Sequence, residues 1–228
     1  MPKSIMFVWN EKKRRWFLAA AEYSRFYQGL AAALEPYLQE NDRIIDMGCG
    51  LGLLSQVLYR KERMIIGYDR DAAVIRLAKE VGEGPQFVCQ TLEQTAASGI
   101  ACETLIACQF GSGENDYDQL FKISAARYIL IKNRHKSHCR IGAHRDTCRE
   151  LMSYLKERGR SFHNFDLELR FDQPLAAAEI DDFCLEYGID RSSIRLFGRD
   201  PVLVEKPKQM TVFIVAGEKS KGEKHEDI

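Results

Sequence analysis

Between residues 43 and 132, short apolar segments alternate with segments that have a helical period. The apolar segments contain few polar side chains, as is typical of strands buried on both faces of a sheet. Strands of this kind that alternate with helices predict an α/β fold, with a parallel sheet and right-handed crossover helices on both faces. The expected strands are residues 43–47, 64–68, 86–89, 105–108 and 128–132, and the expected helices are 51–60 and 71–81.

Further segments flank this core. Aromatic and aliphatic residues at a helical period predict an N-terminal helical extension over residues 10–38, with a break near Pro36. Residues 165–171 alternate between apolar and charged side chains, which predicts a half-exposed edge strand. The other expected elements are helices at 145–158 and 176–187, a short strand at 194–197, and a last buried strand at 210–216.

The length of the chain favours one domain. With 228 residues, of which 45% are hydrophobic, the sequence can bury one substantial core. We expect this domain to span residues 1–216, with a helical lid at 1–40 and substrate-side additions at 133–200. Residues 217–228 are rich in Lys and Glu and predict a disordered tail.

Charge and cysteine content indicate which partners and which cellular location to expect. Lys+Arg and Asp+Glu each total 33, so no overall field draws the chain to nucleic acid or to an anionic membrane. The apolar run at residues 5–9 is followed at once by charged residues 11–15, which fits neither a signal peptide nor a membrane span. The 7 cysteines form no C-x-x-C pair and are expected to be reduced thiols in a cytoplasmic protein.

The most informative motif follows the first expected strand. Glycines at positions 48, 50 and 52 lie where a strand turns into a helix, and glycine permits positive φ angles and close approach of a ligand to the backbone. Asp69 ends the second strand, at the same edge of the sheet, where a carboxylate can accept hydrogen bonds from both hydroxyls of a ribose. Turn and acid together predict an adenosine ligand. A helix cap is the alternative role for Asp69.

The glycine spacing distinguishes between adenosine ligands. A dinucleotide fingerprint requires G-x-G-x-x-G, and its third glycine would fall at position 53, which is Leu53. The spacing here is G-x-G-x-G, which disfavours a nucleotide-dependent oxidoreductase.

Over residues 15–135 the chain resembles the class I S-adenosylmethionine (SAM) dependent methyltransferases. Their first motif reads D-x-G-x-G-x-G after an apolar strand, and their second strand ends in an acid, as in Asp46 to Gly52 and Asp69. The resemblance implies a Rossmann-like, mostly parallel sheet of seven strands whose last strand is antiparallel. Residues 210–216 suit that last strand.

The resemblance also implies a cofactor site for SAM. The glycine turn would face the methionine part, Asp69 would hold the ribose with Arg70 beside it, and Gln109 and Phe110 would lie near the reacting methyl group. Tyr27 would close over the cofactor. The implied site comprises Asp46, Gly48, Cys49, Gly50, Gly52, Asp69, Arg70, the adenine-bordering Gln90, Thr91 and Leu92, and Gln109, Phe110 and Tyr27.

The sequence gives less information about the reaction itself. The segment 107–111, after the fourth strand, lacks the N-P-P-Y type motif of relatives that methylate nucleobase amines. No cysteine follows a proline, which argues against methylation at C5 of pyrimidines. No residue identifies itself as a catalytic base, so none is assigned.

A basic cluster follows the fifth strand. The leading interpretation is that these residues form a solvated loop and helix face. The second is recognition of an anionic substrate through Arg134 or Arg140. The third is zinc binding, because His144 and Cys148 would share a helix face. The metal alternative lacks the usual C-x-x-C pairing, so no metal is assigned. The cluster comprises Lys132, Arg134, His135, Lys136, His138, Cys139, Arg140, His144, Arg145, Cys148 and Arg149.

The expected function is methyl transfer from SAM to a small-molecule acceptor, which the basic cluster allows to be anionic. The alternatives are a nucleic-acid or protein methyltransferase of the same fold and a noncatalytic SAM-binding protein. The sequence identifies neither the acceptor, nor the methylated atom, nor the oligomeric state.

Overall fold

A computed structural model describes residues 9–80, 83–134, 147–199 and 201–217. These residues form two compact units, one from the described parts of 9–32 and 168–208 and the other from the described parts of 33–167 and 209–217. The single domain expected over residues 1–216 stays a prediction. The C-terminal tail and most of the basic cluster, residues 135–146, lie outside the described residues.

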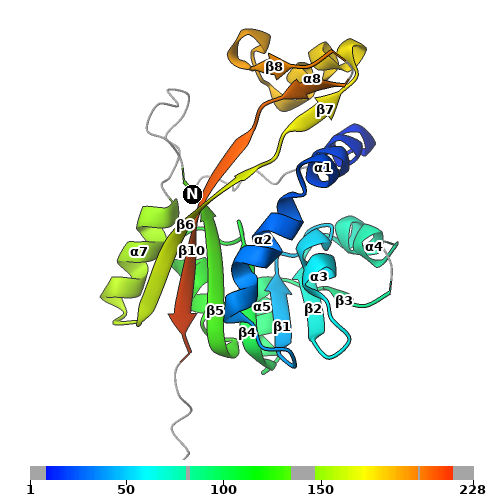
Figure 1. The fold of residues 1–228 in the computed structure, drawn as a ribbon. Coiled ribbons are helices and arrows are strands. Elements are labelled where there is room, and N and C mark those ends of the chain that lie inside the picture. Colours follow the sequence, from blue (N-terminus) through cyan, green and yellow to red (C-terminus); the bar gives the residue numbers. More distant parts are fainter. Residues whose placement is uncertain (1–8, 81–82, 135–146, 200, 218–228) are drawn as a thin grey trace, which may run out of the picture. The chain divides into compact units, whose positions relative to one another are not determined.

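The larger unit contains a seven-stranded sheet, apart from the last residues of β6 and the first residues of β10, with the strand order β3-β2-β1-β4-β5-β10-β6 (Figure 1). Strands β1 to β5 pair in parallel, and β10 pairs antiparallel with β5, with Phe213 opposite Leu130. The expected mostly parallel sheet with an antiparallel last strand is confirmed. The strands are β1 (Arg43–Met47), β2 (Met64–Asp69), β3 (Gln86–Cys89), β4 (Ala101–Cys108), β5 (Ser124–Asn133), β6 (Phe162–Arg170) and β10 (Pro207–Ala216).

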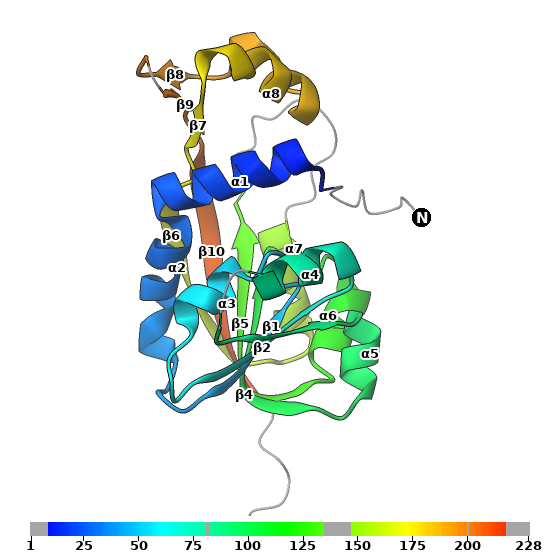
Figure 2. The same ribbon diagram turned by 90° about the vertical axis from the view of Figure 1, so that its right-hand side faces the viewer.

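Helices cover both faces of this sheet. Figure 2 shows α5 (Leu92–Ala97) and α6 (Glu114–Leu120) together on one face, where with α7 (Thr147–Glu157) they enclose a core that includes Tyr117 and Leu130. On the other face, Phe87 of β3 packs against Ile75 and Ala78 of α4 (Ala72–Glu80). A short helix, α3 (Leu53–Leu58), follows the glycine turn.

The topology determines where a site can form. Because β1 to β5 are parallel, their carboxyl ends meet at one edge of the sheet. The segments that leave this edge are 48–52 after β1, 70–71 after β2, 90–91 after β3 and 109–113 after β4. All of them belong to the larger unit.

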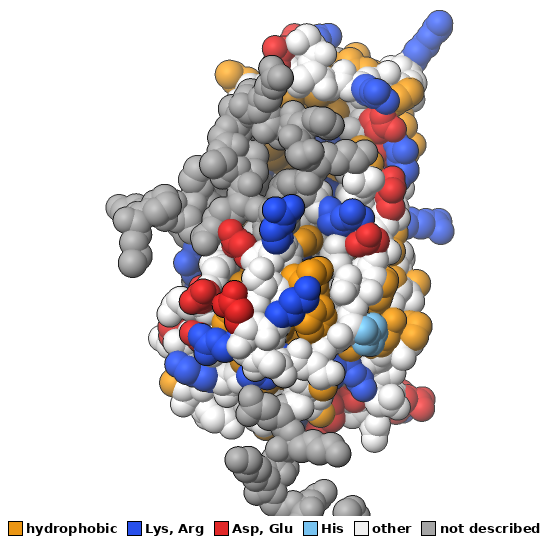
Figure 3. All heavy atoms as spheres, turned by 90° about the vertical axis from the view of Figure 1, so that its left-hand side faces the viewer, with side chains coloured by type: hydrophobic (Ala, Val, Ile, Leu, Met, Phe, Trp, Pro, Cys, Tyr) orange, Lys and Arg blue, Asp and Glu red, His pale blue; other side chains and the backbone are white. Residues whose placement is uncertain are grey.

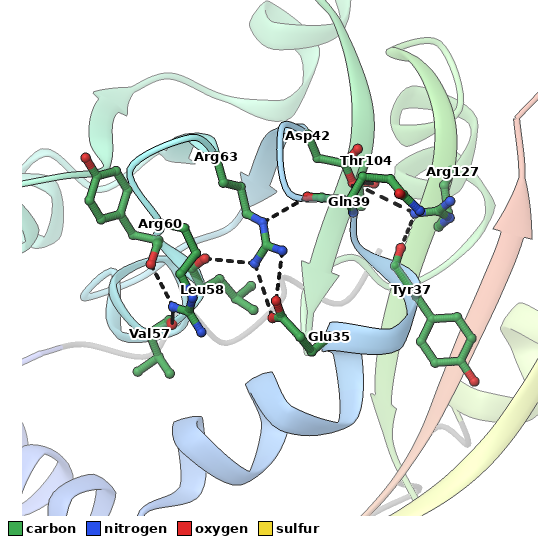
Figure 4. Close-up of polar contacts among 11 residues, drawn as sticks. Glu35, Tyr37, Gln39, Asp42, Val57, Leu58, Arg60, Arg63, Thr104 and Arg127 are labelled. Carbon is green, nitrogen blue, oxygen red and sulfur yellow. Dashed lines mark hydrogen bonds and ion pairs between the residues drawn. The ribbon is translucent and has the colours of Figure 1, made fainter.

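A buried arginine ties together the opposite edge of the sheet (Figure 4). The side chain of Arg63 is 3% exposed and donates from both terminal nitrogens to the carboxylate of Glu35, at 3.2 and 2.9 Å. It also donates to the carbonyls of Leu58 and Gln39. One side chain thereby links the end of α3, the start of β2 and the 3-10 turn at Glu35–Tyr37.

The smaller unit combines N-terminal and C-terminal segments. A three-stranded sheet of order β7-β9-β8 packs with α8 (Ile180–Tyr187) and α1 (Glu11–Ser24), and Trp16 of α1 meets the ring of Phe183 edge-on at 5.3 Å. Two 3-10 turns, Ala177–Glu179 and Arg191–Ser193, flank α8. The strands are β7 (Gln173–Leu175), β8 (Leu196–Phe197) and β9 (Val202–Val204).

The single long N-terminal helix expected over residues 10–38 is wrong in one respect. The helix is interrupted at Arg25, which has a left-handed φ of 47° and caps the end of α1. Helix α2 (Phe26–Leu34) begins at the next residue. The expected break near Pro36 also exists, because α2 gives way there to the 3-10 turn that contains this proline. Helices α5 and α6 and strands β7 and β9 were not predicted.

Figure 3 views the side on which the edge strand β6 and helix α7 lie and shows side chains of both charge signs mixed around a small apolar area. The mixture agrees with equal totals of acidic and basic residues. No helix within the described segments is both long and apolar enough to cross a membrane.

We predict that Arg63→Met lowers the free energy of unfolding by about 2–3 kcal/mol, because the buried carbonyl of Leu58 loses its donor and the carboxylate of Glu35 loses its ion pair. Arg60→Met is the matched control. The exposed Arg60 also donates to two carbonyls, but water can replace it there, so we expect a loss below about 1 kcal/mol. Urea unfolding measures both, and equal losses would contradict the role given to Arg63.

Candidate functional site

The turn after β1 is bound to the end of the neighbouring strand. The backbone N–H groups of Gly48 and Cys49 both donate to the carbonyl of Tyr68, at 2.7 and 3.0 Å. Within the turn, the N–H of Gly52 donates to the carbonyl of Cys49. Hydrogen bonds to the end of β2 therefore fix the turn.

The three glycines of the turn have positive φ angles but different surroundings. A Cβ atom at Gly48 would lie 2.2 Å from the ring of Phe110, and one at Gly52 would lie 2.4 Å from the ring of Phe87. At Gly50 a Cβ atom would meet nothing within 4 Å. Gly48 and Gly52 are thus required for packing as well as for their φ angles, and Gly50 alone faces open space.

The carboxylate of Asp69 stands beside that space. Its Oδ2 accepts from the N–H of Gly50 at 3.1 Å, and its Oδ1 accepts from the N–H of Asp71 at 3.0 Å. These bonds fix the orientation of the carboxylate and use one acceptor position on each oxygen. A carboxylate oxygen has two such positions, so each can still accept a ligand hydroxyl. The cap of α4 is Asp71, which accepts from Ala73 and Val74, and not Asp69.

Asp46 lies beneath the turn and faces no solvent. It is 2% exposed, and its Oδ2 accepts from the hydroxyl of Ser55 at 2.6 Å. Burial raises the pKa of Asp46 to about 6; the Ser55 hydrogen bond opposes this shift and the charge of Asp69 adds to it. Asp46 therefore supports the turn from inside the protein.

Cys49 is held within the turn. Burial, with the charges of Asp46 and Asp69 next, raises the pKa of its thiol. A thiol that stays protonated is a poor nucleophile, so its chemistry is that of a small packing group.

The segments after β3 bring the next predicted residues to the same edge. The N–H of Gln90 donates to the carbonyl of Asp69 at 2.9 Å, which places Gln90 directly beside the acid. Thr91 caps α5 and forms a capping box with Gln94. The side chain of Leu92 is buried in the core under α5, so only its backbone can border a ligand.

The segment 109–113 follows β4 and covers the first glycine. Gln109 has a left-handed φ of 54°, its N–H donates to the carbonyl of Ile131, and its side-chain amide lies 3.8 Å from the sulfur of Met210. Phe110 rests on Gly48. Lys132, which the sequence placed only in the basic cluster, binds this segment from below. The feature of the sequence that could have indicated this contact is a lysine at the end of an otherwise apolar strand.

Other predicted residues are placed less directly. Arg70 is exposed beside the site, and its carbonyl accepts from the thiol of Cys89. Tyr27 packs against Phe17 and Phe26 within the smaller unit, and its closure over the cofactor stays a prediction.

The basic cluster is largely outside the described residues. Its Arg134 forms an ion pair with Asp166 of the edge strand, so a carboxylate of the protein already contacts this guanidinium. No group of three or more metal-ligating side chains is found within the described segments. The histidines of the cluster, His135, His138 and His144, are not among them.

No sequence-family model matches the chain, and no curated protein matches it. Solved structures do match its fold. A magnesium protoporphyrin IX methyltransferase from Synechocystis, with bound S-adenosylhomocysteine, has a TM-score of 0.56 at 15% identity and covers 92% of this chain and 90% of its own. The same enzyme has also been solved with SAM, with a TM-score of 0.53.

Two further structures agree in fold. A SAM-dependent methyltransferase from Thermotoga maritima, described as a possible histamine N-methyltransferase, has a TM-score of 0.55 at 16% identity, with 91% of this chain and 95% of its own covered. A putative methyltransferase from Bacillus halodurans has a TM-score of 0.55 at 10% identity, with 83% and 99% covered. At these identities the matches establish the class I methyltransferase fold.

The buried carboxyl of Asp46 leads to a prediction about pH. Because the folded state binds this proton more tightly than the unfolded state, Asp46 costs stability as pH rises from about 4 to 6, and the cost then stays constant. We expect the free energy of unfolding of Asp46→Asn, relative to the parent, to rise over that window by up to about 3 kcal/mol. Urea unfolding at several pH values measures it.

Ser55→Ala provides the second variant for this prediction. It removes the hydrogen bond that favours the ionised carboxyl, so the pH-dependent loss should become larger than in the parent. A difference between Asp46→Asn and the parent that stays constant from pH 4 to pH 7 would contradict the assignment.

Proposed function

We propose that the protein transfers a methyl group from SAM to a small-molecule acceptor. One observation carries the proposal: the open backbone at Gly50 lies next to the Asp69 carboxylate, and a 3.1 Å hydrogen bond joins them at the exits of β1 and β2. The methyltransferase fold supports it, because this edge of a parallel sheet is where such folds bind their ligands.

The residues fit an adenosyl amino acid. Asp69 would accept from the ribose hydroxyls with its remaining acceptor positions, and Gly50 leaves room for a ligand to lie along the backbone. Gln90 would border the adenine, while Gln109 and Phe110 would border the methionine side. When bound, SAM supplies an activated methyl group on a sulfonium.

The protein's own task is then one of placement. A methyl acceptor must be held in line with the methyl group at about 3 Å, with water excluded. The segments around the glycine turn are anchored by hydrogen bonds to β2 and β5, which suits a site that works by orientation. No catalytic base is proposed.

A small acceptor is favoured over a macromolecule for two reasons. The chain has no net charge, so it lacks the overall field that assists nucleic-acid binding. Among the structural neighbours, the magnesium protoporphyrin IX methyltransferase acts on a small molecule. We propose the cytoplasm as the location, in agreement with the free thiols of Cys49, Cys89, Cys102 and Cys184.

Binding of SAM tests the proposed site. We predict that Asp69→Ala raises the Kd for SAM about 100-fold, because two hydrogen bonds to a charged acceptor are lost. Asp71→Ala is the matched control, since it removes a helix cap beside the site and should cost stability but little affinity. Calorimetry measures both, with circular dichroism to confirm folding.

Blocking the open space provides an independent variant. Gly50→Arg should raise the Kd at least about 100-fold by filling the space beside the backbone. Gly99→Arg is its control, because Gly99 also has a positive φ and open surroundings but lies between α5 and β4, at the opposite edge of the sheet. Equal SAM affinity in Gly50→Arg and Gly99→Arg would disprove the site.

Turnover distinguishes the enzyme from its alternatives. Incubation of the parent with SAM and a set of small amines, alcohols, thiols and carboxylates should release S-adenosylhomocysteine with at least one of them. A noncatalytic binder would hold SAM and release none. A nucleic-acid methyltransferase would instead respond to RNA or DNA, with binding that weakens steeply as salt increases.

A further inference from the structure

Lys132 is a buried cation at the edge of the proposed site. The residue is 2% exposed, and its Nζ lies 2.6 Å from the carbonyl oxygen of Phe110 and 2.5 Å from that of Gly111. The ring of Tyr117 lies beneath it, with its centroid at 5.1 Å. The ion pairs among the described residues do not include Lys132. Two peptide carbonyls and an aromatic face therefore replace the water that this ammonium loses on burial.

These contacts are costly to build. Burial of an ammonium group is unfavourable because the group loses its hydration, and an apolar side chain at this position would avoid that penalty. The contacts that offset the penalty are specific to one loop conformation, because both carbonyls must point at one nitrogen. The group is thus suited to holding the loop in place.

The loop needs such support. Gln109, Gly111 and Gly113 all have positive φ angles, and for Gln109, which has a side chain, the left-handed region is unfavourable. At its two ends the loop is tied by the N–H of Gln109 to Ile131 and by the N–H of Ser112 to the carboxylate of Asp116. Lys132 holds the peptides between these two ties.

The loop contacts the glycine turn through Phe110. The ring of Phe110 lies against Gly48 so closely that a single added carbon atom would collide with it at 2.2 Å. When Lys132 fixes the carbonyl of Phe110, it also fixes where this ring meets the turn. Gln109, one residue earlier, would lie on the methyl-facing side of the proposed site.

We infer that Lys132 is a positioning residue, whose contacts with the Phe110 and Gly111 carbonyls hold the 109–113 loop as a wall of the cofactor site. The inference rests on the proposed function and adds a residue to it. Lys132 acts through the loop and has no need to touch the ligand.

Protonation of Lys132 should affect this role. Burial lowers its pKa to about 8. The titratable groups around it are Asp116 and Tyr117 on α6, Cys148 and Glu150 on α7, and Cys108 on β4. A neutral amine makes weaker hydrogen bonds to carbonyls than an ammonium does. The loop should therefore loosen as pH rises through about 8.

The first measurement is amide hydrogen exchange of the free protein, which needs no cofactor. We expect Lys132→Met to lower protection of the amides of residues 109–113 about tenfold or more, with the strands unchanged, and Lys132→Arg to restore part of it. Lys122→Met, which removes an exposed lysine from the turn before β5, is the matched control and should change nothing. Unchanged protection of residues 109–113 in Lys132→Met would overturn the inference.

The second measurement is the Kd for SAM from pH 6.5 to 9.5. In the parent and in Lys122→Met, affinity should fall several-fold through pH 8, while Lys132→Met should bind about tenfold more weakly at pH 7 and show no such fall. A residue that only stabilises the fold would not produce this difference in pH profile. Equal profiles in the parent and Lys132→Met would overturn the inference.

The two measurements separate the inference from the proposed function. If the parent fails to bind SAM, the proposed function fails, and hydrogen exchange still decides whether Lys132 holds the loop. If Lys132→Met does not fold, exchange of the parent itself, corrected for the intrinsic pH dependence of exchange, must lose protection at residues 109–113 above pH 8. Constant protection there would overturn the inference.

Discussion

The hydrogen bond from the N–H of Gly50 to the carboxylate of Asp69 joins two strand exits that are 19 residues apart in sequence. Parallel pairing of β1 with β2 makes it possible, because Met47 lies opposite Tyr68 and the Tyr68 carbonyl then accepts from the first two amides of the turn. Turn and acid are held in place by these hydrogen bonds within the protein. Preorganisation of this kind avoids an ordering cost on binding, so that more of the contact energy appears as affinity.

Two buried ionisable groups support the loops at this edge. Asp46 lies under the glycine turn and bonds to Ser55, and Lys132 lies under the loop after β4 and bonds to its carbonyls. Burial disfavours the charged form of both groups. It therefore raises the pKa of Asp46 and lowers the pKa of Lys132. Irregular loops expose peptide groups that apolar side chains cannot satisfy. Lys132 satisfies two such carbonyls, and Asp46 bonds to Ser55 of the helix that follows the turn; both residues lie near the carboxyl ends of their strands, β5 and β1.

Local patterns in the sequence predicted the parts of the fold that such patterns determine. Strands β1 to β3, the antiparallel last strand and the partnership of the glycine turn with Asp69 all follow from apolar runs and from the common edge of a parallel sheet. Helices α5 and α6 have only 6 and 7 residues, too few for a clear helical period, although the capping box at Thr91 and Gln94 was a readable signal for α5. The contacts of Phe110 and Lys132 depend on a loop with several left-handed residues, a conformation that residue patterns do not encode.

The glycine motif itself contains two kinds of constraint. At Gly48 and Gly52, aromatic rings occupy the positions where a side chain would begin, and these rings come from segments that follow β4 and form β3. Glycine at these two positions allows the turn after β1 to pack closely against the loop after β4 and against β3. At Gly50 nothing occupies that position, and the neighbouring acid keeps acceptor capacity. A G-x-G-x-G turn of this kind therefore requires glycine for packing at its two ends and leaves the backbone open at its centre.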